Sequence, residues 1–347
     1  MFGPPAWLTV SDEVRSALAA ARPVVALEST LIAHGLPWPT NLETARESEA
    51  AVRAAGAVPA TIAVLNGVPT VGLTDAQLED LARAPGVFKA SRRDLGAAVA
   101  LKRTSATTVS ATMALAHAAG IRVFATGGIG GAHRTEWAVG SGQWADKTKQ
   151  EDPSRNAERE QTGAGSSLPA AHCPRPTGEA FDISADLTEL ARTPVLVVCA
   201  GAKSILHLPR TLEILETLGV PVAGYRTDCF PTFYTRDHVP PLPVSARVES
   251  ARNAAALFAA HVRMGGAGAV LAQPCPSGVA IPAAEFEQWL VVAEREAVAA
   301  NATGAKVTPF LLARLAELSG GRTLVANRVL IVANARLAAE VAVTLGE

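Results

Sequence analysis

Short apolar runs alternate with segments of helical spacing along most of the chain. The runs that predict buried strands are Val24–Leu27, Thr61–Leu65, Val123–Ala125, Val195–Cys199, Val220–Ala223 and Ala269–Leu271. The segments between them place apolar residues three or four positions apart, which is typical of helices packed on one face. These predicted helices are Asn41–Ala55, Thr74–Ala84, Thr108–Ala119 and Glu249–Met264. Strand–helix alternation favours an α/β fold with a largely parallel sheet.

Helix ends and the C-terminal part refine this prediction. Asn41 and Thr74 are predicted as N-caps, because short polar side chains accept hydrogen bonds from the first free backbone amides. Beyond residue 283 the pattern is mostly helical, and the predicted helices are Ala284–Ala300, Pro309–Leu318 and a last segment through Asn334–Leu345. We expect this helical part to pack on the sheet and not to form a domain of its own.

The segment from Arg134 to Ala180 breaks the pattern. It is crowded with Gly, Ser, Pro and charged residues and has almost no apolar periodicity. Long loops without regular structure are uncommon inside a compact domain and are usually functional or disordered. We therefore predict a flexible insertion over 134–180, although Trp137 and Trp144 favour contact of its first part with something apolar.

Composition and charge exclude several classes of protein. The 347 residues carry 31 Lys plus Arg and 32 Asp plus Glu, a formal net charge of −1, whereas bulk nucleic-acid binding needs a basic excess. The N-terminus lacks a basic region followed by an apolar stretch, and no window has about 18 uninterrupted apolar residues. We expect a cytoplasmic protein that binds neither nucleic acid nor membrane. The four cysteines are far apart, which suggests neither a zinc site nor disulfides.

Two charged residues at strand ends are the first candidates for chemistry. Glu28 ends the first apolar strand, where open α/β sheets place ligands; a capping or ion-paired glutamate is the alternative. Lys203 follows Val195–Cys199 through three small residues, Ala200-Gly201-Ala202. Loss of hydration there favours a neutral, nucleophilic amine, and a lysine that pairs with phosphate or carboxylate is the alternative.

Three further motifs carry weaker signals. The run Thr126–Gly131, followed by His133, allows backbone amides to approach an anion, although a tight structural turn has the same sequence. Asp182 and Asp186 lie four residues apart around Ser184, which suits a hard divalent cation or ordinary helix capping. Lys89 lies in the charged segment 89–94, and such runs usually form a solvated face.

Taken in order, these motifs resemble one family. ALEST, HGLPWPTN, KASRRDL, SATTVSATM, VFATGGIGGAHR, FDISADL, VVCAGAKSIL and VANRVLIVANA are similar to motifs of the pseudouridine-5'-phosphate glycosidases, also called indigoidine synthase A-like proteins. The resemblance runs from about residue 10 to the C-terminus with one gap. It implies a single α/β/α domain with a largely parallel sheet and a helical C-terminal part, assembled as a homotrimer, with one Mn²⁺ per subunit.

The resemblance also implies roles for individual residues. Glu28 corresponds to a proton donor, Lys203 to a lysine that bonds covalently to the sugar, and Asp182 to a manganese ligand. The positions expected to bind substrate are Lys89, Val109, Thr126, Gly130, Gly131, His133, Ser184, Ala185, Asp186 and Asn327, the last beside the nucleobase. The implied substrate is a nucleotide with a carbon–carbon glycosidic bond, which is cleaved reversibly through a lysine imine to uracil and ribose 5-phosphate.

The chain departs from the family pattern at the insertion 134–180 and at Gln273–Pro276, where an Asn-Pro is common. These departures keep a second hypothesis open, a relative that joins ribose 5-phosphate to another aromatic acceptor. A third, a non-catalytic sugar-phosphate binding protein, is disfavoured because both Glu28 and Lys203 are present.

Overall fold

A mixed sheet of eleven strands organises the residues that the computed structural model describes, which are 4–134, 183–236, 238–300, 302 and 307–346. Its main path runs β1 (Thr9–Val10), β4 (Val68–Val71), β3 (Val58–Leu65), β2 (Val24–Leu27), β7 (Val123–Ala125), β8 (Leu196–Cys199), β11 (Ala269–Ala272), β9 (Val222–Tyr225) and β10 (Ala246–Val248). Two more strands, β5 (Phe88–Ala90) and β6 (Ser105–Thr107), extend it through a β6–β3 pair. Only the β3–β4 and β3–β6 pairs within the described ranges are antiparallel, so the predicted largely parallel α/β fold is confirmed.

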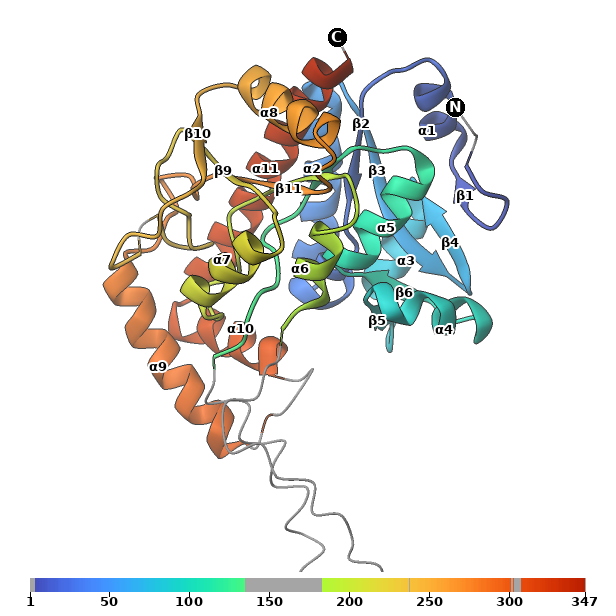
Figure 1. Ribbon diagram of the computed structural model, residues 1–347. Coiled ribbons are helices and arrows are strands. Elements are labelled where there is room, and N and C mark those ends of the chain that lie inside the picture. Colours follow the sequence, from blue (N-terminus) through green and yellow to red (C-terminus); the bar gives the residue numbers. More distant parts are fainter. Residues whose placement is uncertain (1–3, 135–182, 237, 301, 303–306, 347) are drawn as a thin grey trace, which may run out of the picture.

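Helices cover both faces of this sheet. They are α1 (Asp12–Ala19), α2 (Thr40–Ala54), α3 (Asp75–Arg83), α4 (Leu95–Ala100), α5 (Val109–Ala119), α6 (Ala185–Leu190), α7 (Leu208–Thr217), α8 (Ala251–Arg263), α9 (Ala283–Ala299), α10 (Val307–Leu318) and α11 (Arg322–Gly346). Two short turns of other helix types, η1 (Leu31–Gly35) and η2 (Arg92–Asp94), complete the set. Figure 1 shows α9 and α10 together at one end of the molecule.

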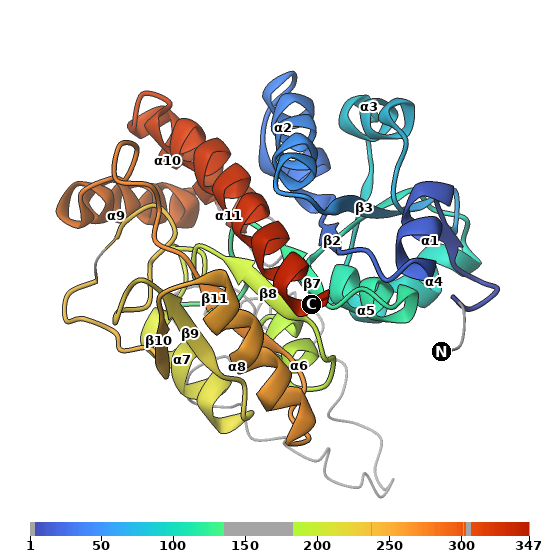
Figure 2. The same ribbon diagram turned by 90° about the horizontal axis from the view of Figure 1, so that it is seen from above.

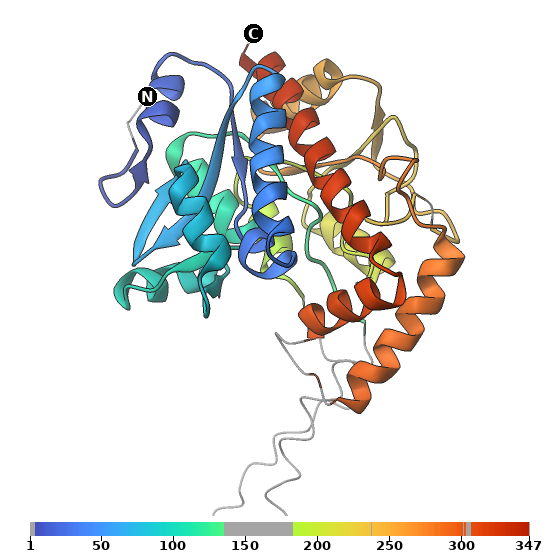
Figure 3. The same ribbon diagram turned by 180° about the vertical axis from the view of Figure 1, so that it is seen from behind.

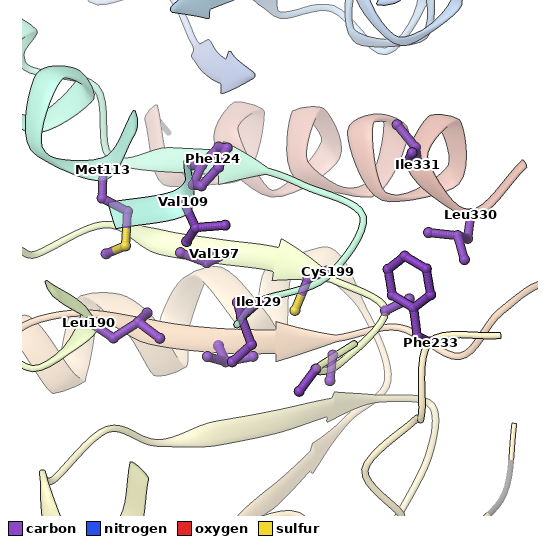
Figure 4. Packing of buried hydrophobic residues seen from close by; sticks show 14 of the residues in the cluster. Val109, Met113, Phe124, Ile129, Leu190, Val197, Cys199, Phe233, Leu330 and Ile331 are labelled. Carbon is purple, nitrogen blue, oxygen red and sulfur yellow. The ribbon is translucent and has the colours of Figure 1, made fainter. Parts of the chain in front are cut away.

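Strand residues alternate between two cores, which defines the layers. Val25 and Leu27 of β2 pack with residues of α2, α8 and α11, whereas Val24 and Ala26 pack with residues of α1, α5, α6 and α7. This alternation follows from the two-residue period of a strand and accounts for the continuous apolar runs in the sequence. Seen from above, α2 and α11 lie on the side of the sheet opposite α5 and α6 (Figure 2). Figure 4 shows part of the core that includes residues of α1, α5, α6 and α7, where Met113 and Val109 lie close to Phe124 and Val197.

The C-terminal helix α11 is part of the packed structure. It is the one described helix that is long and apolar enough to cross a membrane, yet half of its most apolar window is buried against the protein. It packs against α2 and α8 and against strands β2, β7 and β8, and Figure 3 shows it alongside α2. The apolar composition of α11 is therefore that of a core helix.

One predicted helix start is wrong. Asn41 does not cap α2, which begins at Thr40 after Pro39. Asn41 is buried, and its side-chain amide donates to the backbone oxygens of Ile32 (2.7 Å) and Ala82 (3.0 Å). These bonds tie η1 to the end of α3. The side-chain oxygen of Asn41 accepts from Leu42 N–H (2.8 Å), so it bonds to an amide of the first turn from within the helix and not from the N-cap position. The prediction for Thr74 is confirmed, because its hydroxyl accepts from Gln77 in a capping box.

The strand order reverses direction between β2 and β7. From β2 the chain adds β3 and β4 on one side, whereas β7 and β8 follow on the other. Open parallel sheets bind ligands at such a switch point, outside the carboxyl ends of the strands. We therefore expect a ligand-binding site at the carboxyl ends of β2, β7 and β8.

Candidate functional site

Glu28 lies directly after β2 and is buried, with 7% of its surface exposed. The Thr126 hydroxyl, at the end of the neighbouring strand β7, donates a short hydrogen bond to its carboxylate. Burial raises the pKa of Glu28, against the opposing effects of the Lys203 charge and the Thr126 bond. A carboxyl group in this environment holds its proton at a higher pH than an exposed one, as a general acid requires.

Lys203 reaches the same place from β8. Its loop continues the β7–β8 pairing beyond the strands: Ala200 N–H donates to Gly127 O (2.8 Å) and Lys203 N–H donates to Ile129 O (3.1 Å). Ile129 N–H donates in turn to Gly201 O (3.0 Å). Backbone hydrogen bonds from the glycine run after β7 thus fix the position of the loop that carries Lys203.

Glu28, Lys203 and Lys89 meet in a cavity with two lobes. The first, which we call the polar lobe, has a volume of about 160 Å³ and is also lined by Gly130, His133 and Asp186, together with Ser91, Thr108, Val109, Ser110, Ser184, Ala185, Leu206 and Thr308. The second, the apolar lobe, has about 70 Å³ and is also lined by Phe233, Tyr234, Leu312, Asn327 and Ile331 among others. Glu28, Thr30, Lys89, Lys203 and Thr308 line both lobes. The predicted acid and the predicted nucleophile therefore lie where the lobes join.

Lys89 places a second amine in this cavity. The residue as a whole is exposed, but loss of hydration around its amine, followed by the nearby Lys203 charge, lowers its pKa. The carboxylates of Glu28 and Asp186 act in the opposite direction. Two lysines and two carboxylates thus share one polar site, which suits an anionic substrate and proton transfer.

Asp186 is a structural anchor of the polar lobe. It is buried, and its two carboxylate oxygens accept from Ser110 N–H (3.0 Å) and Gly130 N–H (2.9 Å). Ser184 caps α6 by accepting from Asp186 N–H (3.2 Å), which confirms the capping alternative for this motif. The carboxylate therefore holds the start of α6 against the glycine run.

The glycine run itself is divided between roles. Gly130 lines the polar lobe, but Gly127 and Gly128 line the apolar lobe, so the run does not form one continuous cradle for an anion. Gly131 lies outside both linings, where a Cβ atom would meet the Thr211 side chain at 2.3 Å. Its position reflects close packing on α7.

Asn334 secures the end of β7 from the opposite layer. It is buried in α11, and its side-chain amide donates to Thr126 O (2.9 Å) and Gly127 O (3.4 Å). Because Thr126 in turn bonds to Glu28, Asn334 fixes the residue that orients the predicted acid. Thr126 itself is absent from the lining of both lobes.

The remaining predicted site residues line one of the two lobes or lie outside the described residues. Val109, His133, Ser184 and Ala185 line the polar lobe, and Asn327 lines the apolar lobe. Asp182, Trp137, Trp144 and the rest of the predicted insertion beyond Arg134 lie outside the described residues. Among the described residues, no group of three or more His, Cys, Asp or Glu side chains is arranged to hold a metal ion.

Several lining residues were not predicted from the sequence, and three of them have chemical or structural consequences. Thr30, which lines both lobes, has a buried hydroxyl with no hydrogen-bond partner among the described residues, and the same is true of the side-chain oxygen of Asn327. His34 and Phe233 line the apolar lobe. Loss of hydration, followed by the Lys89 charge, lowers the pKa of His34, which favours a neutral imidazole. Thr30 and His34 lie inside the quoted motifs ALEST and HGLPWPTN, whereas Phe233 lies in none of the quoted motifs.

Comparison with known proteins identifies the family of the chain. The family model for Indigoidine synthase A like protein matches residues 13–141 and 171–344, leaving 142–170 unmatched within the predicted insertion. A Methylobacterium nodulans protein named pseudouridine-5'-phosphate glycosidase is 48% identical over 339 residues, covering 97% of this chain and 88% of that protein. A Symbiobacterium thermophilum protein of the same name is 46% identical over 339 residues, covering 97% of each.

Two solved structures are similar to this chain over nearly its whole length. The prealnumycin C-glycosynthase AlnA, in complex with ribulose 5-phosphate, superposes with a TM-score of 0.79 at 38% identity, covering 99% of this chain and 98% of that one. An indigoidine synthase A-like protein from Thermotoga maritima gives 0.77 at 31% identity, covering all of both chains. The matches span nearly the whole chain, and the chain belongs to the family of indigoidine synthase A-like proteins.

Proposed function

We propose that this protein is a pseudouridine-5'-phosphate glycosidase. The reaction consumes pseudouridine 5'-phosphate and water, breaks the carbon–carbon bond between uracil and ribose, and releases uracil and ribose 5-phosphate. The observation that carries the proposal is the meeting of Glu28 and Lys203 at the junction of a polar and an apolar lobe. Relatives of nearly full length carry this name.

Glu28 serves as the acid. A carbon-linked base has no leaving oxygen to protonate, so the mechanism of ordinary glycosidases does not apply. Glu28, with its raised pKa, instead donates its proton to the ribose ring oxygen as the bond from this oxygen to C1' breaks. The opened sugar leaves C1' conjugated with the uracil ring and open to attack.

Lys203 serves as the nucleophile. Its amine adds to C1' and forms a carbon–nitrogen bond. Protonation of uracil C5 then breaks the carbon–carbon bond, which releases uracil and leaves an imine between Lys203 and ribose 5-phosphate. Water adds to the imine, restores the lysine and releases the sugar phosphate.

The polar lobe binds the ribose phosphate and the apolar lobe binds the base. Lys89 and His133 bring cationic or hydrogen-bonding groups to the polar lobe. In the apolar lobe, the unpartnered side-chain oxygen of Asn327 accepts an N–H of the base. Three charged residues line both lobes, so this assignment follows from the residues that line only one. These are Asp186 and His133 in the polar lobe, and Phe233, Tyr234, Leu312 and Ile331 in the apolar lobe.

Manganese at Asp182 remains a prediction from the family resemblance. Asp186, in the same motif, has both carboxylate oxygens occupied by backbone amides. The described residues alone therefore do not form a complete cation site. We likewise propose, from the resemblance, a homotrimer in the cytoplasm.

The direct test is conversion of pseudouridine 5'-phosphate, with uracil and ribose 5-phosphate both quantified by chromatography. Glu28→Gln should lower kcat by about 10²–10⁴-fold, the range for loss of a general acid. Glu340→Gln is the matched control, because Glu340 is exposed and lines neither lobe. A wild-type enzyme that releases no uracil contradicts the proposal.

The second candidate function is the joining of ribose 5-phosphate to a different aromatic acceptor. It is favoured by the similarity to AlnA, which is named a C-glycosynthase. A panel of aromatic acceptors incubated with ribose 5-phosphate distinguishes the two. If another acceptor is joined while pseudouridine 5'-phosphate is not cleaved, this second function replaces the first.

A further inference from the structure

Phe233 has an unusual backbone conformation at the edge of the site. Its φ is +64°, in the left-handed region that bulky side chains rarely adopt. Residues held in such conformations cluster at functional sites, where the surrounding structure over-determines them.

The backbone of this segment packs against the loop that carries Lys203. Phe233 N–H donates to Ala200 O (2.9 Å), three residues before the lysine. Gly201, with φ +83°, lies so close to Pro231 that a Cβ atom would stand 1.9 Å from the Pro231 oxygen. The left-handed turn thus follows from a tight fit between two loops at the site.

The ring of Phe233 is held on several sides. A Cβ atom on Gly128 would lie 2.5 Å from the ring, so the ring rests directly on the glycine run. Figure 4 shows the ring directed toward Leu330 and Ile331 of α11. Tyr234 meets it edge-on with centroids 4.6 Å apart, and Phe286 supports Tyr234 from 5.7 Å. The ring of Phe233 therefore forms a rigid wall of the apolar lobe.

The lobe behind this wall is small. It has about 70 Å³, whereas an engineered apolar cavity that binds one benzene ring has about 150 Å³. One six-membered ring uses all of this lobe together with space at its junction with the polar lobe. A second fused ring exceeds the volume of this lobe, and Phe233 is part of the wall that such a ring meets.

We propose that Phe233 is a specificity-determining residue that limits the base to a single six-membered ring. The inference rests on the proposed function, because it assigns the apolar lobe to the base. It identifies the preferred ligand as a monocyclic compound with an N–H for the Asn327 oxygen, and it excludes fused bicyclic rings.

The test compares uracil with quinazoline-2,4-dione, which carries the same N–H and carbonyl edge plus one fused ring. Both are titrated calorimetrically into the full-length enzyme free of ribose 5-phosphate, so that neither compound reacts with or meets the sugar, and both are measured as inhibitors of cleavage. The wild type should bind the bicyclic compound at least about tenfold more weakly, as expected for a filled cavity. Phe233→Gly removes the ring and suits the left-handed backbone, and it should reduce this ratio by about tenfold.

Phe258→Leu is the control, because it removes a buried ring from α8 in the other core without lining either lobe, and it should keep the wild-type ratio. If Phe233→Gly does not fold, Phe233→Asn tolerates the same backbone conformation. If neither variant folds, the ratio of wild-type affinities for the two compounds tests the inference by itself. Equal wild-type affinity for the two compounds, or an unchanged ratio in a folded Phe233 variant, overturns the inference. If the enzyme does not cleave pseudouridine 5'-phosphate but shows the expected affinity ratios for the two compounds, only the proposed function is rejected.

Discussion

Adding one methyl group at Gly130 tests whether the polar lobe has to keep its shape. A Cβ atom at this position would lie 2.3 Å from Ser184 Oγ and 2.8 Å from Asp186 Oδ2. Ser184 is fixed as the N-cap of α6, and Asp186 is held by backbone amides, so neither side chain can yield freely. Overpacking of this kind costs about 1–3 kcal/mol of unfolding free energy.

The expected effect on catalysis is larger than the effect on folding. Gly130→Ala displaces Asp186 and lengthens its bond to Gly130 N–H, now 2.9 Å. A shift of about 1 Å in a positioning group can lower kcat/KM by about 10²-fold. We expect a loss of this order in uracil release, with the unfolding free energy measured in parallel by urea denaturation and circular dichroism.

Gly96→Ala is the control, because no atom lies within 4 Å of its Cβ position and Gly96 is on the exposed side of α4. Alanine there should raise the unfolding free energy by about 0.5–1 kcal/mol, as for helix interiors generally, and leave kcat/KM unchanged. Wild-type kcat/KM in Gly130→Ala would refute the reasoning that Gly130 and Asp186 shape the substrate site.

Three further predictions concern the acid, the phosphate and the metal. Thr126→Val removes a hydrogen bond that favours the charged carboxylate, so the pKa of Glu28 should rise further and the alkaline limb of the kcat/KM profile should move to higher pH. An unmoved limb would argue against Glu28 as the acid. Unphosphorylated pseudouridine should show a far lower kcat/KM than its 5'-phosphate, because binding energy from the phosphate is lost; comparable values would reject the assignment of the polar lobe. Dialysis against EDTA should lower activity and Mn²⁺ should restore it, with the response lost in Asp182→Asn; activity indifferent to EDTA would contradict the predicted metal.

The fold was largely predictable because its central strands are buried on both faces. Val24–Leu27 and Val123–Ala125 were predicted with the bounds that the structure has, since continuous apolar runs between helices have few other interpretations. The edge of the sheet was missed. Strands β1, β5 and β6 have only two or three residues, and they form through pairing with distant partners, which no local pattern reveals.

The site was predictable where chemistry coincides with a strand end. Glu28 and Lys203 follow β2 and β8, and neighbouring parallel strands bring such residues to one edge of the sheet. Phe233 and Asn334 could not be predicted in this way. Phe233 contributes through a left-handed turn after β9, and Asn334 reaches Thr126 across 208 positions of sequence. Both depend on tertiary contacts that exist only in the folded chain.

The most direct test of the account is chemical trapping of the covalent intermediate. The enzyme is incubated with ribose 5-phosphate, reduced with borohydride, digested and analysed by mass spectrometry. The account predicts one stable adduct of the reduced sugar phosphate on Lys203, absent without the sugar and absent in Lys203→Ala, whose turnover should fall by several orders of magnitude. An adduct on Lys89 alone, or no adduct in an enzyme that releases uracil normally, would contradict it.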